Sequence, residues 1–191
     1  MVVDVGSDDV TLLGFYPSDS ATLVGFDPTA QKFRDYYRDH VIVMPQFFSS
    51  ELIKTHFGGR RAMAVTSISM FYDLERPLEF TRNVHEILAD EGIWVLEQSY
   101  LPTMMEMNAY DTVCHEHLEY YALRQRKWTA DRVGFKIVDV RLNTVNGGSS
   151  AVTMAKSGSR HEENTKLVEE VVGRERALGL GRLVPFQTGS P

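Results

Sequence analysis

The sequence predicts an α/β fold, with a seven-stranded sheet that is mostly parallel and ends in an antiparallel hairpin. Short runs rich in valine and isoleucine alternate with longer segments of helical period, which is the pattern of parallel strands joined by crossover helices. The last two runs are separated only by residues 143–148, which are too few for a crossover helix and include Asn-Gly, a hairpin signal. The final pair of strands is therefore expected to be antiparallel.

Each predicted element has a typical composition or boundary. The predicted strands are 2–5, 21–26, 40–43, 62–68, 92–98, 135–142 and 149–155. The predicted helices are 9–15, 29–37, 50–57, 77–88 and 119–133. Thr29 and Ser50 are expected N-caps, Pro77 suits a first helical turn, and Gly134 suits the position after a helix end. Crossover strands followed by a terminal hairpin are the pattern of the Rossmann-like sheet of class I methyltransferases.

The chain is expected to divide into a core, residues 1–157, and a C-terminal tail, residues 158–191. The tail is polar and charged, so it is expected to be partly flexible. One helix is predicted over 162–178, where apolar residues recur at helical spacing. We interpret the tail as truncated from a further domain.

Composition limits the classes of function. The 191 residues are 43% hydrophobic and 24% charged, which fits one globular domain. A net charge of −6 without a Lys/Arg cluster argues against nucleic acid as a partner. The apolar runs fall far short of the roughly 20 residues of a membrane span, and the single cysteine, Cys114, indicates a reducing, cytoplasmic setting. A small-molecule substrate is the expected partner, and the sequence is also compatible with a homo-oligomer.

Acidic residues and a glycine follow the first two predicted strands. Asp4 and Gly6 lie at the carboxyl end of the first strand, where an open α/β sheet binds its ligand. Asp27 ends the second strand roughly 20 residues later, a position from which a carboxylate can accept hydrogen bonds from both ribose hydroxyls. Alternatively, Asp27 caps the helix predicted near Thr29, and Gly6 is an ordinary turn glycine. A Rossmann dehydrogenase is disfavoured because the G-x-G-x-x-G fingerprint is absent.

A dense polar cluster follows the fifth predicted strand. Residues 111–121 include His115 and His117 with Glu116 between them. A zinc site needs three or four ligands of fixed geometry, and nothing else in the sequence obviously completes one, so no metal is expected. A histidine beside a glutamate can instead act as a general base, because the carboxylate orients the ring and raises its basicity. A satisfied polar loop is the alternative.

Blocks of sequence that occur in one order resemble a known family. They read Val-Val-Asp-Val-Gly-Ser, Thr-Ser-Ile-Ser-Met-Phe-Tyr-Asp-Leu, Gly-Ile-Trp-Val-Leu-Glu-Gln-Ser-Tyr, Cys-His-Glu-His-Leu-Glu-Tyr-Tyr and Asn-Gly-Gly-Ser. Over roughly residues 2–180 the chain is similar to the sugar C-methyltransferases. The resemblance implies S-adenosylmethionine as cofactor and a role in deoxysugar biosynthesis. The implied substrate is a nucleotide-linked sugar of the thymidine-diphospho-4-keto-6-deoxyhexose type, methylated through an enolate at C3.

The resemblance also implies roles for individual residues. His117 is the implied base, with Glu116 and His115 as its neighbours. Tyr110 or Tyr72 directs a hydroxyl at the enolate oxygen, although Tyr72 can equally be a packed aromatic at a strand end. The implied cofactor-binding residues are Asp4, Gly6, Ser7, Asp27, Pro28, Thr66 and Ser67.

Three departures from the family leave alternatives open. The family has a glycine where this chain has Val10, and a branched side chain there is expected to weaken cofactor binding. The zinc-binding region before the core and the domain after it are expected to be absent or cut short. The helix before the first strand is also expected to be missing, as in a fragment. The alternatives are an impaired or non-catalytic cofactor-binding core, and a methyltransferase acting on oxygen or nitrogen of another small molecule.

Overall fold

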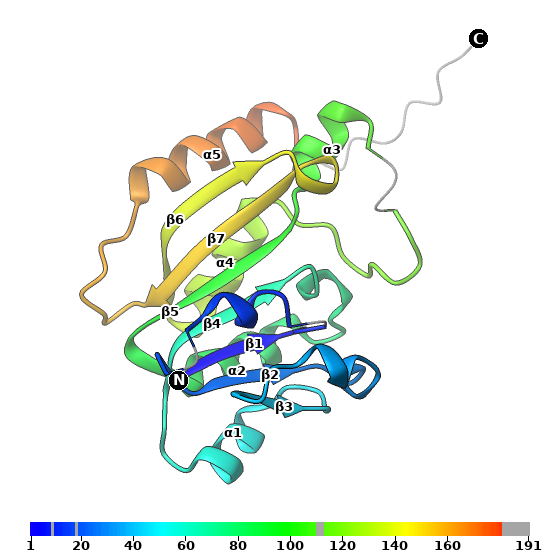
Figure 1. The fold of residues 1–191 in the computed structure, drawn as a ribbon. Coiled ribbons are helices and arrows are strands. Elements are labelled where there is room, and N and C mark those ends of the chain that lie inside the picture. The colour runs from blue at the N-terminus through cyan, green and yellow to red at the C-terminus, as the bar shows by residue number, and fades with distance from the viewer. Residues whose placement is uncertain (9, 18, 110–112, 181–191) are drawn as a thin grey trace.

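The strands form a single mixed sheet. A computed structural model describes residues 1–8, 10–17, 19–109 and 113–180, and its strand order is β3-β2-β1-β4-β5-β7-β6 (Figure 1). The strands are β1 (Val2–Val5), β2 (Leu23–Phe26), β3 (Val41–Met44), β4 (Ala62–Ile68), β5 (Leu88–Ser99), β6 (Phe135–Asn143) and β7 (Ser149–Lys156). Strands β1 to β5 pair in parallel, and β7 runs antiparallel between β5 and β6. The predicted α/β sheet with a terminal antiparallel hairpin is confirmed.

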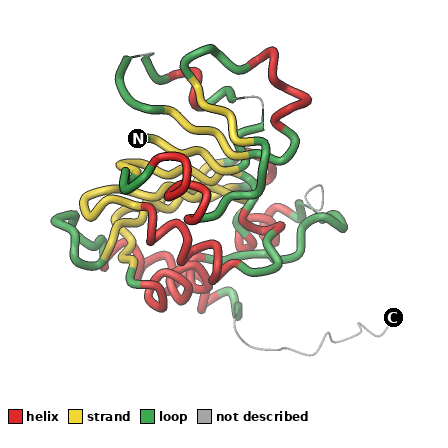
Figure 2. The backbone as a smooth tube through the Cα atoms, turned by 90° about the horizontal axis from the view of Figure 1, so that it is seen from below, coloured by secondary structure: helices red, strands yellow, loops and turns green. Residues whose placement is uncertain are grey.

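Most helices gather on one side of the strands (Figure 2). The α-helices are α1 (Ser50–Phe57), α2 (Pro77–Ile87), α3 (Leu101–Met107), α4 (Leu123–Val133) and α5 (Thr165–Ala177). Short 3-10 turns are η1 (Leu13–Phe15), η2 (Ala30–Tyr36), η3 (Phe71–Asp73) and η4 (Val145–Gly147). Helix α2 packs between α1 and α4. Beneath these helices Trp94 of β5 contacts Phe71, Phe80 and Phe135, which forms the aromatic centre of the main core.

Two predicted helices are only 3-10 turns. In the predicted helix 9–15 the described turn is η1, because Gly14 weakens a helix and Pro17 soon follows it. In 29–37 only Ala30 of η2 is buried, so no apolar stripe holds a longer α-helix on the sheet. Thr29 makes no side-chain cap there.

Other boundaries differ by small shifts. Ser49, and not Ser50, is the N-cap of α1, because its side chain accepts a hydrogen bond from the Leu52 N–H at 3.3 Å. Pro77 begins α2 and Gly134 follows α4 in a left-handed conformation, as predicted. Helix α3 was not expected, although Pro102 in its first turn is a typical start signal.

The C-terminal helix α5 packs on the core. It lies beside β6 and contacts α4 and β6 (Figure 1). Its buried face includes Val168, Val171 and Val172. Asn164 caps its start by accepting a hydrogen bond from the Leu167 N–H at 3.3 Å. The division at residue 157 stays a prediction.

Candidate active site

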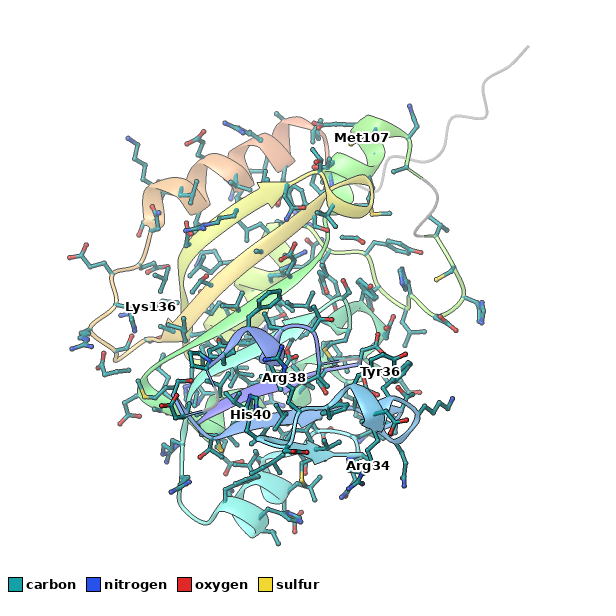
Figure 3. The ribbon with its side chains drawn as sticks, viewed as in Figure 1. Arg34, Tyr36, Arg38, His40, Met107 and Lys136 are labelled. Atoms are coloured by element: carbon teal, nitrogen blue, oxygen red, sulfur yellow. The ribbon has the colours of Figure 1, made fainter. Side chains whose placement is uncertain are left out.

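A cavity of about 520 Å³ opens at the carboxyl ends of the central strands. Strand β1 lies between β2 and β4, so the strand order changes direction there, which is where open α/β sheets bind ligands. The lining includes Gly6, Asp27 and Pro28, which were predicted to bind the cofactor. Figure 3 shows Arg34 and Tyr36 at this edge, on the segment η2 that follows Asp27 in the chain.

Asp4 is a buried carboxylate at the end of β1. Its side chain is 4% exposed, and it accepts a hydrogen bond from the Thr66 hydroxyl on the adjacent strand. Burial raises the pKa of Asp4 to about 6, the Thr66 hydrogen bond opposes this shift, and the charge of Asp27 adds to it. A cationic group nearby would stabilise the ionised carboxylate.

Asp4→Asn is expected to stabilise the ligand-free protein at neutral pH. The pKa of Asp4 is raised above its ordinary 3.8, so the proton bound in the folded state favours folding below about pH 4, and this contribution is lost as pH rises through about 6. At pH 7 the ionised carboxylate therefore disfavours folding by on the order of 2–3 kcal/mol, which an isosteric amide removes. Denaturant unfolding of both proteins at about pH 4 and pH 7 checks this; an equal difference at both pH values would contradict it.

The turn after β1 approaches the neighbouring strands closely. Gly6 has φ +76°, and an added Cβ would lie 3.1 Å from the Met70 Cγ, so only glycine fits without strain. The buried Ser7 hydroxyl shares a hydrogen bond with the Tyr37 hydroxyl at 2.9 Å. Gly25 leaves room for this contact, because an added Cβ would lie 2.7 Å from Ser7 Oγ. Ser7 therefore fixes the turn to β2 and η2.

Asp27 fixes the tips of two loops and lines the cavity. Its Oδ1 accepts hydrogen bonds from the N–H and the hydroxyl of Thr29 at 2.6 and 2.7 Å, and its Oδ2 accepts one from the Asp8 N–H at 3.1 Å. Asp27 thus anchors Thr29, which is itself the N-cap residue of η2, while its Oδ2 keeps a lone pair for a further donor. The two roles are compatible in one carboxylate.

Two predicted cofactor residues on β4 point to different surroundings. Thr66 bonds to Asp4, whereas Ser67 is fully buried and accepts a hydrogen bond from Trp94 Nε1 at 3.2 Å. Successive side chains of a strand point to opposite faces of the sheet. The structure therefore places Ser67 in the helix-side core and not with Asp4.

Val10 differs from the expected contact with the cofactor. Its side chain is 2% exposed and packs with Val2, Leu13, Leu23 and Val41, and it does not line the cavity. Its backbone has φ +67°, which a β-branched residue rarely adopts. A valine at this position therefore strains the backbone of the first loop, where a glycine would not.

Tyr72 and His117 lie together beside the cavity. Their ring centroids are 4.0 Å apart, and the Tyr72 carbonyl accepts hydrogen bonds from the N–H groups of Leu118 and Glu119 at 3.0 and 3.1 Å. Burial raises the pKa of Tyr72 against an opposing hydrogen bond with the Ser69 side chain. This arrangement joins a phenol that stays protonated to an imidazole, two groups suited to acid–base chemistry.

Asp73, which lines the cavity, connects it to this pair. Burial raises the pKa of Asp73, and the charge of His117 opposes that shift. His117 therefore lies close enough to the cavity lining to interact electrostatically with Asp73.

His115 and Glu116, the other predicted members of the cluster, have exposed side chains that face each other. The side chains of His115 and Glu116 are 93% and 76% exposed, and their closest N and O atoms are 4.0 Å apart. Among the described contacts none joins Glu116 to the His117 ring, so the role of Glu116 in orienting His117 stays a prediction. Tyr110 lies outside the described residues.

The loop after β3 supplies cavity residues that the sequence reasoning missed. Gln46, Phe47 and Phe48 line the cavity; Phe47 is 82% exposed, and Phe48 packs edge-on against Phe26. An amide beside an exposed aromatic suits a flat heterocycle with hydrogen-bonding edges. These residues follow a predicted strand, so the rule that selected Asp4 and Asp27 could have found them.

Two other kinds of feature, a metal-binding cluster and a membrane-spanning helix, are absent from the described ranges. There, His, Cys, Asp and Glu side chains form no group of three or more that could hold a metal ion. No described helix has both the length and the apolar character needed to cross a membrane.

The sequence matches a known family model, described as "Methyltransferase domain", over residues 1–140. It is 29% identical to the C-methyltransferase NovU of Streptomyces niveus over 98% of this chain and 44% of that relative, so the chain spans less than half of the relative's length.

Solved structures share the fold at low sequence identity. The LepI complex with SAM superposes with a TM-score of 0.63 at 16% identity, over 82% of this chain and 42% of that one. Magnesium protoporphyrin IX methyltransferase (ChlM) from Synechocystis PCC 6803 with bound SAH gives 0.61 at 13% identity, over 82% and 74%. These likenesses establish the fold.

Proposed function

The chain belongs to the methyltransferase domain family, and from that premise we propose that it methylates C3 of a nucleotide-linked 4-keto-deoxysugar through an enolate. The cofactor of this methyltransferase domain is S-adenosylmethionine. The observation that carries the proposal is the contact between Tyr72 and His117 beside the cavity at the sheet's ligand-binding edge.

The cavity residues fit S-adenosylmethionine. Gly6 lets the backbone approach a ligand that a side chain would exclude, and Asp27 offers an acceptor to ribose hydroxyls. Gln46 and Phe47 suit the adenine ring. The Asp4 carboxylate, which is buried at the end of β1 outside the cavity lining, would attract an ammonium group bound nearby. When bound, the cofactor supplies an electrophilic methyl group on sulfur.

Carbon methylation beside a ketone needs a base and a donor for the enolate oxygen. His117 accepts the proton from the substrate C–H bond, and the electron pair left on carbon would take the methyl group that the bound cofactor supplies from its sulfur. Tyr72, which burial keeps protonated, donates a hydrogen bond to the oxygen where negative charge develops. Asp73 stabilises the imidazolium that forms.

The choice of carbon and of a sugar substrate rests on the resemblance. The similarity to a C-methyltransferase supports carbon as acceptor, and the ordered blocks support a nucleotide-linked keto sugar. The second candidate is a core that binds the cofactor without turnover. It is favoured by two exposed apolar side chains on the segment that carries His117, Val113 and Leu118, which are 56% and 53% exposed. Oxygen or nitrogen methylation is the third.

Calorimetric titration with S-adenosylmethionine and its demethylated product tests the cofactor site. Micromolar binding is expected at about pH 7.5. Because Asp4 is protonated well below about pH 6, the affinity for the cationic ligand is expected to fall at about pH 5. Absence of binding at both pH values would contradict the site.

Substrate proton exchange then separates the three candidates. With a thymidine-diphospho-4-keto-6-deoxyhexose in D2O, loss of the C3 proton together with a C-methyl product supports the proposal. Methyl transfer without exchange indicates an oxygen or nitrogen acceptor. Cofactor binding without exchange or transfer indicates the non-catalytic core.

A further inference from the structure

The segment that carries His117, residues 100–122, connects the end of β5 to the start of α4. Its two ends lie side by side, because the Leu101 N–H donates to the Tyr121 carbonyl at 3.1 Å. Between these ends the segment docks on the Tyr72 carbonyl. The position of the His117 ring therefore depends on how both ends are held.

One carboxylate from helix α5 bonds to both ends. Glu175 is 1% exposed, and its Oε1 accepts hydrogen bonds from the Tyr100 hydroxyl and the Leu123 N–H, both at 2.6 Å. Its Oε2 accepts one from the Arg124 N–H at 3.1 Å. Tyr100 is the first residue of the segment, and Leu123 and Arg124 begin the helix that follows it.

Helix α4 needs this carboxylate at its N-terminus. Its N-cap residue is Ala122, whose side chain has no acceptor for the first N–H groups. Glu175 satisfies two of those groups from another helix, and its negative charge is favourable at the positive end of the helix dipole.

The buried charge also has a counterpart. Arg126 is 1% exposed and donates hydrogen bonds to the Ser150 carbonyl and hydroxyl and to the Ser99 carbonyl. Burial lowers the pKa of Arg126 to about 10, and electrostatic interactions with the Tyr100 hydroxyl and with the charge of Glu175 oppose that shift. Burial and then Glu175 raise the pKa of Tyr100, so its hydroxyl stays a donor. Removing one partner of such a buried pair leaves the other charge uncompensated, so Glu175 contributes to stability as well as to geometry.

We infer that Glu175 is a positioning residue of the active site, which holds both ends of the segment carrying His117 through Tyr100, Leu123 and Arg124. Its effect on turnover rests on the proposed function, in which His117 is the base. Its effect on the segment is independent of the substrate.

Three variants of the full chain test the inference. Glu175→Ala removes all three hydrogen bonds, and Glu175→Gln keeps one acceptor oxygen. Val171→Ala is the matched control, because it weakens α5 packing one turn before Glu175 and leaves the three hydrogen bonds of Glu175 in place. Hydrogen exchange of the Leu118 and Glu119 amides, which bond to Tyr72, reports on the segment. Turnover and cofactor affinity are measured in parallel.

In Glu175→Ala we expect these amides to exchange at least about tenfold faster and kcat to fall on the order of 10- to 100-fold, with cofactor affinity nearly unchanged. In Glu175→Gln the increase in amide exchange and the loss of kcat should both be smaller. In Val171→Ala neither the exchange of these amides nor kcat should change. Unchanged exchange in Glu175→Ala, or the same increase in Val171→Ala, would overturn the inference. If Glu175→Ala does not fold, Tyr100→Phe and Glu175→Gln supply the same readouts. A parent protein without turnover refutes the proposed function, and hydrogen exchange alone then decides on Glu175.

Discussion

Replacing His117 with glutamine is expected to lower kcat by about 10²–10⁴-fold while cofactor affinity stays within about twofold. Glutamine is of similar polarity but cannot take a proton from carbon near neutral pH. The His117 ring contacts Tyr72 beside the cavity and is not part of its lining, so the cofactor loses no contact. Single-turnover kinetics and calorimetric titration of the variant measure the two quantities separately.

His115→Gln is the matched comparison for this experiment. It makes the same chemical change two positions away, on a side chain that is 93% exposed and faces Glu116. Its effect on kcat is expected to be less than about threefold. Equal losses in both variants would show that the proposed base has been assigned to the wrong histidine, and unchanged turnover in His117→Gln would refute general-base catalysis by this segment.

Asp27→Asn is expected to weaken S-adenosylmethionine binding by about 10- to 100-fold. A hydrogen bond to a charged group contributes about 1.5–3 kcal/mol, which corresponds to a loss of this size when ribose hydroxyls lose an ionised acceptor. The side chain lines the cavity and lies at the carboxyl end of β2. Calorimetric titration of the variant measures the change in affinity.

The control for Asp27 separates ribose binding from loop anchoring. Thr29→Val removes the hydroxyl that donates to Asp27 Oδ1 at 2.7 Å and leaves the carboxylate in place. Its affinity for the cofactor is expected to change by less than about threefold. If Thr29→Val weakens binding as much as Asp27→Asn, the carboxylate acts by fixing the loop and not by contacting the ribose.

Much of the candidate cofactor site could be predicted because its signals are local. Asp4, Gly6 and Asp27 lie at strand ends, and the predicted bounds of β4 match the observed Ala62–Ile68. The same rule applied to the third strand would have added Gln46 and its aromatic neighbours. Amphipathic patterning failed at η1 and η2, where too little apolar surface is buried to extend a helix.

By itself the sequence determined the succession of strands along the chain, the antiparallel final pair and the strand ends that form the cavity. These follow from periodicity and turn chemistry within short windows. Only the tertiary structure decided that Ser67 bonds to Trp94, that Val10 points into the core, and that Glu175 reaches Tyr100 across 75 positions of the chain. Those contacts depend on the packing of segments that are distant in sequence, and no local pattern encodes which distant partner a buried polar group will meet.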